Sequence, residues 1–195
     1  VSLLDLPDSH IAIRYLRSRY FTREECDKFN VTYCSLNCSK YSRYLENRLV
    51  FPFYTNGVLT GYQTRVLDSR DKSSKYWLLP GSKKSSTFFG FSLFDDIKEI
   101  YLVEGVFDSI RLGVGGFALF GKSISTDQIN ILKSYYSTTQ IYVMLDEDAL
   151  SDSYKVKRKL EEAGCRNSIK VVKILNKDPA DNTREEIQGW IDNTK

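Results

Sequence analysis

The sequence predicts an α/β fold, in which a mostly parallel sheet with helices on both faces follows a smaller α+β part. In the second half, short apolar runs alternate with segments of helical spacing, as in sheets whose strands are buried on both faces. In the first half, apolar residues flank an Asn-Gly pair, which is typical of an antiparallel hairpin. We expect two domains, over residues 1–94 and 95–195.

The α+β part begins with two short helices. Ser9 can cap the first helix, and Ile13, Leu16 and Tyr20 recur in it at helical spacing. Thr22 opens the second, with a glutamate three residues on that can complete a capping box. Residues 49–54 and 58–67 then read as two strands joined by the turn at 55–57, and residues 76–79 form a further apolar run.

The second half alternates between the two kinds of element. We expect strands at 100–103, 117–120, 141–145 and 169–175. We expect helices at 107–112, 126–136, 153–163 and 184–191, with Gly164 ending the third of them. This order predicts parallel strands joined by helical crossovers.

Composition and cysteine spacing exclude several classes of protein. Of the 195 residues, 42% are hydrophobic and 27% are charged, which is ordinary for a globular chain. No apolar run approaches the roughly 20 residues that cross a bilayer, so we expect no membrane association. Cys34 and Cys38 form one close pair, but a closed zinc site usually needs two such pairs. We therefore expect free thiols at all four cysteines.

The charges are unevenly distributed, although the net charge is only +3. Basic residues predominate between residues 11 and 70, whereas acidic residues gather in the second half. This division suits a phosphate-rich ligand with a metal ion beside it. Two solvated faces would give the same pattern.

Acidic side chains follow three of the four strands expected in the second half. They are Glu104 with Asp108 after the first, Asp146 and Asp148 after the third, and Asp178 and Asp181 after the fourth. Because ligands bind beyond the carboxyl ends of parallel strands, we expect these carboxylates to converge. Their mutual repulsion would be relieved by a hard divalent cation such as Mg²⁺. The alternative is that they are helix caps and exposed turn residues.

Three motifs in the second half resemble those of the Toprim domain. They are Leu-Val-Glu-Gly-Val-Phe-Asp at 102–108, Leu-Asp-Glu-Asp-Ala at 145–149 and Lys-Asp-Pro-Ala-Asp at 177–181. The resemblance begins near Ile97 and covers about half the chain. Bacterial-type primases, topoisomerases and some nucleases share this domain.

The first half resembles the start of the RNA polymerase core of DnaG-type primases. The similar segments lie at 15–19, 47–53, 61–65, 74–76 and 84–90, and Phe-Gly-Lys-Ser at 120–123 takes the place of the family's Leu-Gly-Thr. The resemblance implies nucleotide or nucleic-acid contacts at Arg19, Arg48, Arg65, Lys75, Lys84 and Lys122.

The resemblance implies a DNA primase, an enzyme that joins ribonucleotides into short RNA primers on single-stranded DNA. The implied catalytic residues are Glu104, Asp108, Asp146 and Asp148, and the implied ligands of Mg²⁺ or Mn²⁺ are Glu104, Asp146, Asp148, Asp178 and Asp181. The implied partners are the template, ribonucleoside triphosphates and a replicative helicase, in cis or in trans. We expect this fragment to be monomeric and cytoplasmic, in the host cytoplasm if its source is a phage.

Two other functions remain open. A Toprim nuclease would use the same acidic residues and metal ions, but it would not need the basic segments of the first half. A non-catalytic nucleic-acid-binding module could retain the fold alone. A topoisomerase is disfavoured, because its strand-gate domains need a longer chain than this one.

Overall fold

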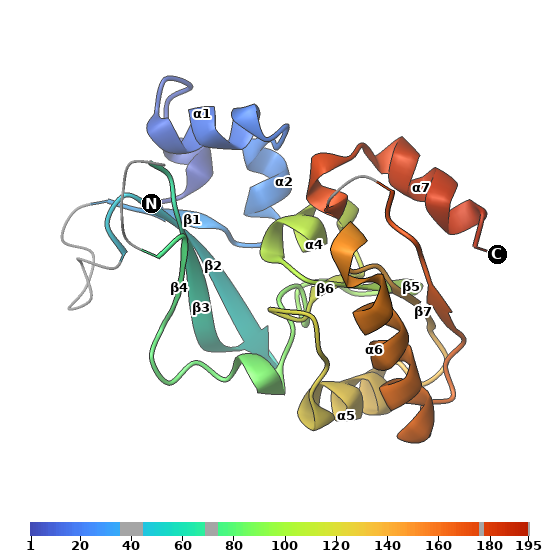
Figure 1. Ribbon diagram of the computed structural model, residues 1–195. Helices are drawn as coiled ribbons and strands as arrows, with labels where there is room; N and C mark the ends of the chain where they lie inside the picture. Colours follow the sequence, from blue (N-terminus) through green and yellow to red (C-terminus); the bar gives the residue numbers. More distant parts are fainter. Residues whose placement is uncertain (36–44, 69–73, 176–177, 195) are drawn as a thin grey trace. The chain divides into compact units, whose positions relative to one another are not determined.

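The computed structural model describes residues 1–35, 45–68, 74–175 and 178–194, and it divides into two compact units (Figure 1). The first unit comprises Val1–Phe53 and Val58–Ser82, and the second comprises Tyr54–Gly57 and Lys83–Lys195. Apart from the hairpin turn at Tyr54–Gly57, the boundary between the units therefore lies between Ser82 and Lys83. The expected division of function between residues 1–94 and 95–195 stays a prediction.

The first unit combines short helices with an antiparallel sheet. Its elements are η1 (Leu3–Asp5), α1 (Ile11–Ser18), α2 (Arg23–Asp27), β1 (Thr32–Cys34), β2 (Arg48–Thr55), β3 (Val58–Val66) and β4 (Tyr76–Leu78), with strand order β1-β2-β3-β4. Leu49, Phe51 and Phe53 alternate along β2 and are almost fully buried. One side of this strand therefore supplies core to the unit.

Some local sequence signals in the first half of the chain predict the structure correctly, and others do not. The Thr22–Glu25 capping box opens α2 as expected. The hairpin turn is confirmed, because Asn56 and Gly57 both have positive φ, as a type I′ turn requires. The cap of α1 was predicted wrongly: His10, not Ser9, accepts the N–H of Ala12. Tyr20 is also not a helical core residue, because α1 ends at Ser18 and Tyr20 is 84% exposed.

The second unit contains a four-stranded parallel sheet, which confirms the predicted α/β class. Its strands are β5 (Glu99–Val103), β6 (Gly116–Ala118), β7 (Gln140–Val143) and β8 (Ile169–Val171), in the order β6-β5-β7-β8. Its helices are α4 (Val106–Leu112), α5 (Thr126–Tyr135), α6 (Leu150–Glu162) and α7 (Arg184–Asp192). Three 3₁₀ turns complete it: η2 (Lys84–Ser86), η3 (Glu147–Ala149) and η4 (Pro179–Asp181).

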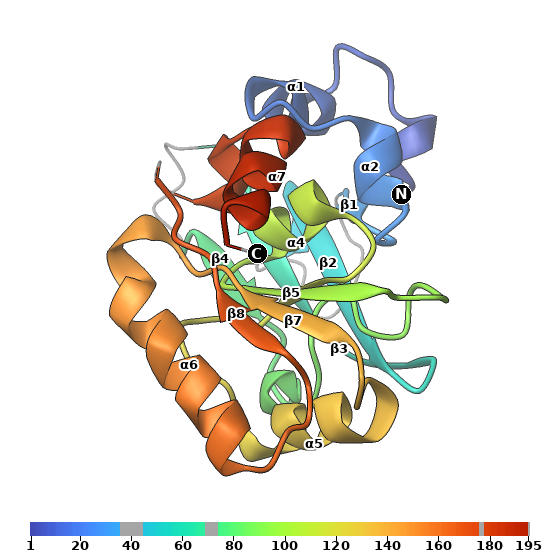
Figure 2. The ribbon, with the colours of Figure 1, turned by 90° about the vertical axis from the view of Figure 1, so that its right-hand side faces the viewer.

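Helices cover both faces of this sheet. Figure 2 shows α4 and α7 on one face and α5 and α6 on the other. Leu102 and Val143 pack with Leu132 of α5 and Leu160 of α6 in one buried cluster. On the opposite face, glycine at 116 lets α4 approach β6, because a Cβ there would collide with the carbonyl of Ser109.

The expectation of free thiols holds for two of the four cysteines. Cys26 and Cys165 are free thiols as expected, but Cys34 is disulfide-bonded, and Cys38 lies outside the described residues. Among the residues that the structure describes, no helix is long and apolar enough to cross a membrane.

Candidate metal centre

The order of the strands reverses direction between β5 and β7. The chain runs from β5 outwards to β6 and then returns past β5 to β7. The helices that follow β5 and β7, α4 and α6, lie on opposite faces of the sheet (Figure 2). Adjacent strands with this arrangement leave a gap for a ligand beyond their carboxyl ends. Glu104 directly follows β5, and Asp146 and Asp148 follow β7.

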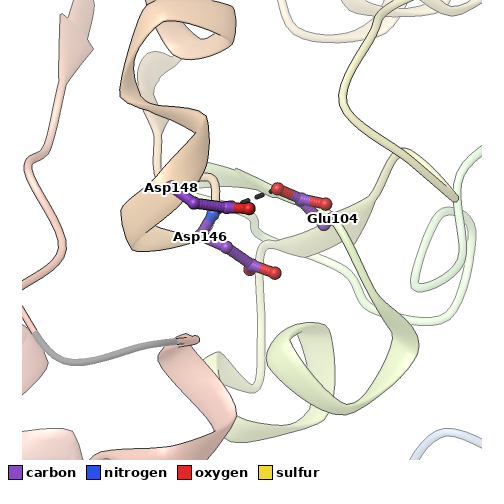
Figure 3. Close-up of side chains that lie close together, drawn as sticks. All are labelled: Glu104, Asp146 and Asp148. Carbon is purple, nitrogen blue, oxygen red and sulfur yellow. Dashed lines mark hydrogen bonds between the residues drawn. The ribbon is translucent and has the colours of Figure 1, made fainter.

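Three carboxylates meet at the carboxyl ends of these two strands. Glu104, Asp146 and Asp148 each offer an oxygen, and these oxygens all lie within 4.8 Å of one another. The backbone N–H of Asp146 donates a hydrogen bond to Oε1 of Glu104 over 3.3 Å, drawn as a dashed line in Figure 3. We call these three residues the acidic cluster. The predicted convergence of strand-end carboxylates therefore holds for them.

Burial and mutual repulsion perturb the protonation of the acidic cluster. Burial, followed by the negative charges of Asp108, Glu104 and Asp178, raises the pKa of Asp146 to about 8. Burial also raises the pKa of Glu104, although the nearby Lys122 partly opposes that rise. Oδ1 of Asp146 is buried and accepts no hydrogen bond from the described residues. An additional positive charge would therefore stabilise the ionised cluster.

A lysine lies against the exposed side of the acidic cluster. The Nζ of Lys122 donates to Oδ1 of Asp148 over 2.8 Å and lies 4.0 Å from Oε1 of Glu104. The side chain of Asp148 is 78% exposed and that of Lys122 is 42% exposed, whereas that of Glu104 is only 14% exposed. The hydrogen bond to Asp148 raises the pKa of Lys122, so this residue carries its charge at neutral pH.

The acidic cluster fits a divalent cation. All three side chains offer carboxylate oxygen, the ligand preferred by hard cations such as Mg²⁺. The unpartnered Oδ1 of Asp146 supplies a coordination position that the fold itself leaves unused. Raised carboxylate pKa values are also typical of functional sites, where like charges are held close together.

The other three predicted carboxylates have different surroundings. Asp108 is buried, with Oδ2 accepting the N–H of Gly105 at 3.0 Å and Oδ1 accepting that of Ala180 at 2.9 Å. Asp178 precedes η4 and is close enough to Asp146 to raise the pKa of that residue. Asp181, within η4, is exposed. These three residues are therefore not brought into the acidic cluster.

Sequence reasoning missed one nearby acid, Asp152 on α6. Its charge contributes to the raised pKa of Glu104, and it pairs with Lys155 over 2.7 Å. Its position four residues after Asp148, one helical turn further on, was the available signal.

Comparisons of the fold with solved structures give consistent results. The chain aligns over its whole length with the zinc-binding and RNA polymerase domains of Aquifex aeolicus primase, at 22% identity and a TM-score of 0.74, covering 57% of that chain. It aligns over 97% with a DnaG primase catalytic domain bound to single-stranded DNA, at 17% identity and a TM-score of 0.75, covering 73% of that chain. The chain has the fold of the DnaG primase catalytic core.

The primase fold extends to a phage relative. The primase fragment of the bacteriophage T7 primase-helicase aligns over 92% of this chain and 72% of its own, at 20% identity and a TM-score of 0.67. No protein-family model and no curated protein sequence matches this chain.

Within the primase-like fold, two of the predicted basic contacts are partly enclosed in the first unit. Arg48 is 3% exposed, and its guanidinium donates to Oγ1 of Thr64 and to the carbonyl of Ser74. Arg65 lies over the ring of Tyr76, 4.7 Å from its centroid, and Nε and Nη1 of Arg65 are buried without a hydrogen-bond partner among the described residues. Of the two, Arg65 is the one with guanidinium nitrogens that no described residue accepts from.

The remaining predicted basic contacts lie in both units. Arg19 is half-buried at the end of α1, and Lys75 is exposed just before β4. Lys84 is exposed in η2 of the second unit. Lys122 is exposed in the same unit, in the segment before α5. Lys177, in the third predicted motif, lies outside the described residues. Of these side chains, Lys122 is the one that the structure brings to the acidic cluster.

Proposed function

We propose that the chain is the catalytic core of a DnaG-type primase, a DNA-directed RNA polymerase that makes short RNA primers on single-stranded DNA. The observation that carries this proposal is the acidic cluster at the carboxyl ends of β5 and β7, in a chain whose fold aligns with primase cores over 92–100% of its length. The second unit is then a Toprim domain. The alignment covers 57% of the Aquifex chain. The activity of a whole primase is therefore part of what we propose for this chain.

The carboxylates of Glu104, Asp146 and Asp148 would hold one or two Mg²⁺ or Mn²⁺ ions. Such an ion, when bound, binds triphosphate oxygens, acidifies the attacking 3′-hydroxyl and stabilises negative charge on the pyrophosphate leaving group. Asp108 holds the Gly105 turn through one oxygen and Ala180 through the other, which fixes the backbone beside Glu104. Asp178, whose charge acts on Asp146, would complete the acidic surroundings and orient water.

The basic side chains would hold the phosphates of template and nucleotide. Arg65, Lys75, Arg19 and Lys84 are the candidates, and binding through them would weaken with added salt. Arg48 would act differently, because its buried guanidinium holds Thr64 and Ser74 in place. The partners would be single-stranded DNA, ribonucleoside triphosphates and a replicative helicase, in the cytoplasm of a cell or of a phage-infected host.

Primer synthesis tests the proposal directly. Single-stranded DNA, the four ribonucleoside triphosphates and Mn²⁺ or Mg²⁺ are supplied, and labelled RNA products are resolved on a gel. We expect short RNA from the wild-type chain and none from the Glu104→Gln variant, which removes one charge with little change in shape. Lys157→Gln, which removes a lysine paired with Glu161 further along α6, is the matched surface control.

Two outcomes would contradict the proposal. Template degradation without RNA synthesis would favour the Toprim nuclease. Template binding without either reaction, even with the flanking primase modules supplied, would favour a non-catalytic module.

A further inference from the structure

Lys122 lies on a short segment that is anchored beside the acidic cluster. The N–H of the preceding Gly121 donates to the carbonyl of Glu104 over 3.2 Å. A few residues later, Ser125 caps α5 by accepting the N–H of Gln128 over 3.1 Å. Hydrogen bonds on both sides therefore set where the side chain of Lys122 begins, and the four-carbon chain of a lysine lets its ammonium move.

The ammonium of Lys122 occupies the side of the cluster that faces solvent. Among the described residues, the ion pairs of Glu104 and Asp148 are both with Lys122. Since Asp148 and Lys122 are substantially exposed, their ion pair adds little to stability and exchanges readily. The interaction nevertheless occupies one carboxylate oxygen of Asp148 and holds a positive charge beside the cluster.

We propose that Lys122 is a tethered counter-ion, which neutralises Asp148 and Glu104 in the free protein and transfers to the triphosphate of the nucleotide when metal and nucleotide bind. This inference rests on the proposed function, because it needs a metal site at the acidic cluster. On release from Asp148, the ammonium remains beside the carboxylates that would hold the metal-bound triphosphate. Phosphate oxygens then offer it new acceptors of the same charge.

This exchange has two consequences of opposite sign. The ammonium of Lys122 competes for Asp148 and repels a second cation at the cluster, so Lys122 weakens the binding of a divalent cation alone. Once the cation is bound, Lys122 strengthens the binding of a triphosphate. An ordinary surface ion pair would affect neither measurement.

Two binding measurements on the Lys122→Gln variant test the inference. Free Mn²⁺ is followed by electron paramagnetic resonance during a titration without nucleotide, and we expect about two- to fivefold tighter Mn²⁺ binding than in the wild type. Calorimetry with ATP at saturating Mn²⁺ follows, and we expect about tenfold weaker binding. Lys122→Arg keeps the charge and should restore most of the ATP affinity.

The matched control is Lys157→Gln, which removes a lysine that is 33% exposed from a 3.7 Å ion pair with Glu161. Both of its affinities should stay within about twofold of the wild type. Unchanged Mn²⁺ and ATP affinities in Lys122→Gln, with Mn²⁺ binding still lost in Asp146→Asn, would overturn the inference and leave the metal site intact. Equal Mn²⁺ binding by the wild type and Asp146→Asn would instead overturn the proposed function, and this inference with it.

Discussion

Asp108 and Asp146 are two acidic residues of one unit that the fold treats in opposite ways. Asp108 is 5% exposed, and both of its oxygens accept backbone N–H groups. Asp146 is half-buried, its Oδ1 accepts no hydrogen bond from the described residues, and its pKa is raised to about 8. Buried polar groups are usually satisfied. The hydrogen bonds of Asp108 therefore support the fold, whereas Oδ1 of Asp146 is left without a hydrogen-bond partner among the described residues.

Substituting each residue should give the largest contrast. Asp146→Asn should lower primer synthesis by about a hundredfold or more, because a ligand of the catalytic metal is lost. Its free energy of unfolding should stay equal or rise, because a repelled charge disappears. Asp108→Ala should lower the free energy of unfolding by about 1–3 kcal/mol, since the N–H groups of Gly105 and Ala180 lose their acceptor. Urea unfolding and the primer assay measure the two effects.

The reverse pattern would contradict this division of roles. A destabilised Asp146→Asn chain, together with a fully stable Asp108→Ala chain, would show that Asp146 supports the fold. Circular dichroism of both variants establishes that each is folded before activity is compared.

The pH dependence of stability should sharpen the contrast further. The pKa of Asp146 is raised from 3.8 to about 8 by burial and neighbouring charges, so the folded chain binds more protons than the unfolded chain between these values. The free energy of unfolding should therefore fall as the pH rises from about 4 to about 8. Glu104 contributes with the same sign, because its pKa is also raised.

Urea unfolding at a series of pH values, without divalent cations, measures this slope. In Asp146→Asn the slope should be shallower, and the variant should gain stability over the wild type as the pH rises. Parallel curves for the two proteins would show that Asp146 does not titrate in this window. Added Mn²⁺ should stabilise the wild type most at high pH, because binding to the folded state alone raises its stability.

The sequence was sufficient for the elements of the second unit and for the edge at which the acidic cluster forms. Apolar runs such as 100–103 and 141–145 reveal buried strands, and parallel strands share one carboxyl edge. Glu104, Asp146 and Asp148 could be placed together for this reason. Element ends were less predictable: α6 begins at Leu150, three residues before the predicted start, because η3 leads directly into it.

The division of roles among the charged residues could not be predicted, because it depends on partners far away in the chain. Asp108 meets Ala180, 72 residues later, and nothing near Asp108 signals that contact. Arg48 is a similar case, since its partners Thr64 and Ser74 lie 16 and 26 residues away. A basic residue in a family-like motif was interpreted as a phosphate contact, whereas tertiary structure buries this guanidinium.

The smallest effects should distinguish the two acidic residues of the 178–181 segment. The charge of Asp178 is among the main causes that raise the pKa of Asp146, whereas Asp181 is an exposed residue of η4. Asp178→Asn should therefore lower the pKa of Asp146 and weaken Mn²⁺ binding by up to about tenfold, as the loss of residues around metal ligands commonly does.

Asp181→Asn serves as the matched control, because it removes the same charge three residues away. Its Mn²⁺ affinity should stay within about twofold of the wild type, as for exposed charges elsewhere. Carbon-detected NMR titration of the Asp146 carboxyl, together with Mn²⁺ titration, separates the two variants. Equal losses of Mn²⁺ affinity in both would place Asp181 beside Asp178 in the metal site, and the contrast between satisfied and unsatisfied carboxylates would then not extend to this segment.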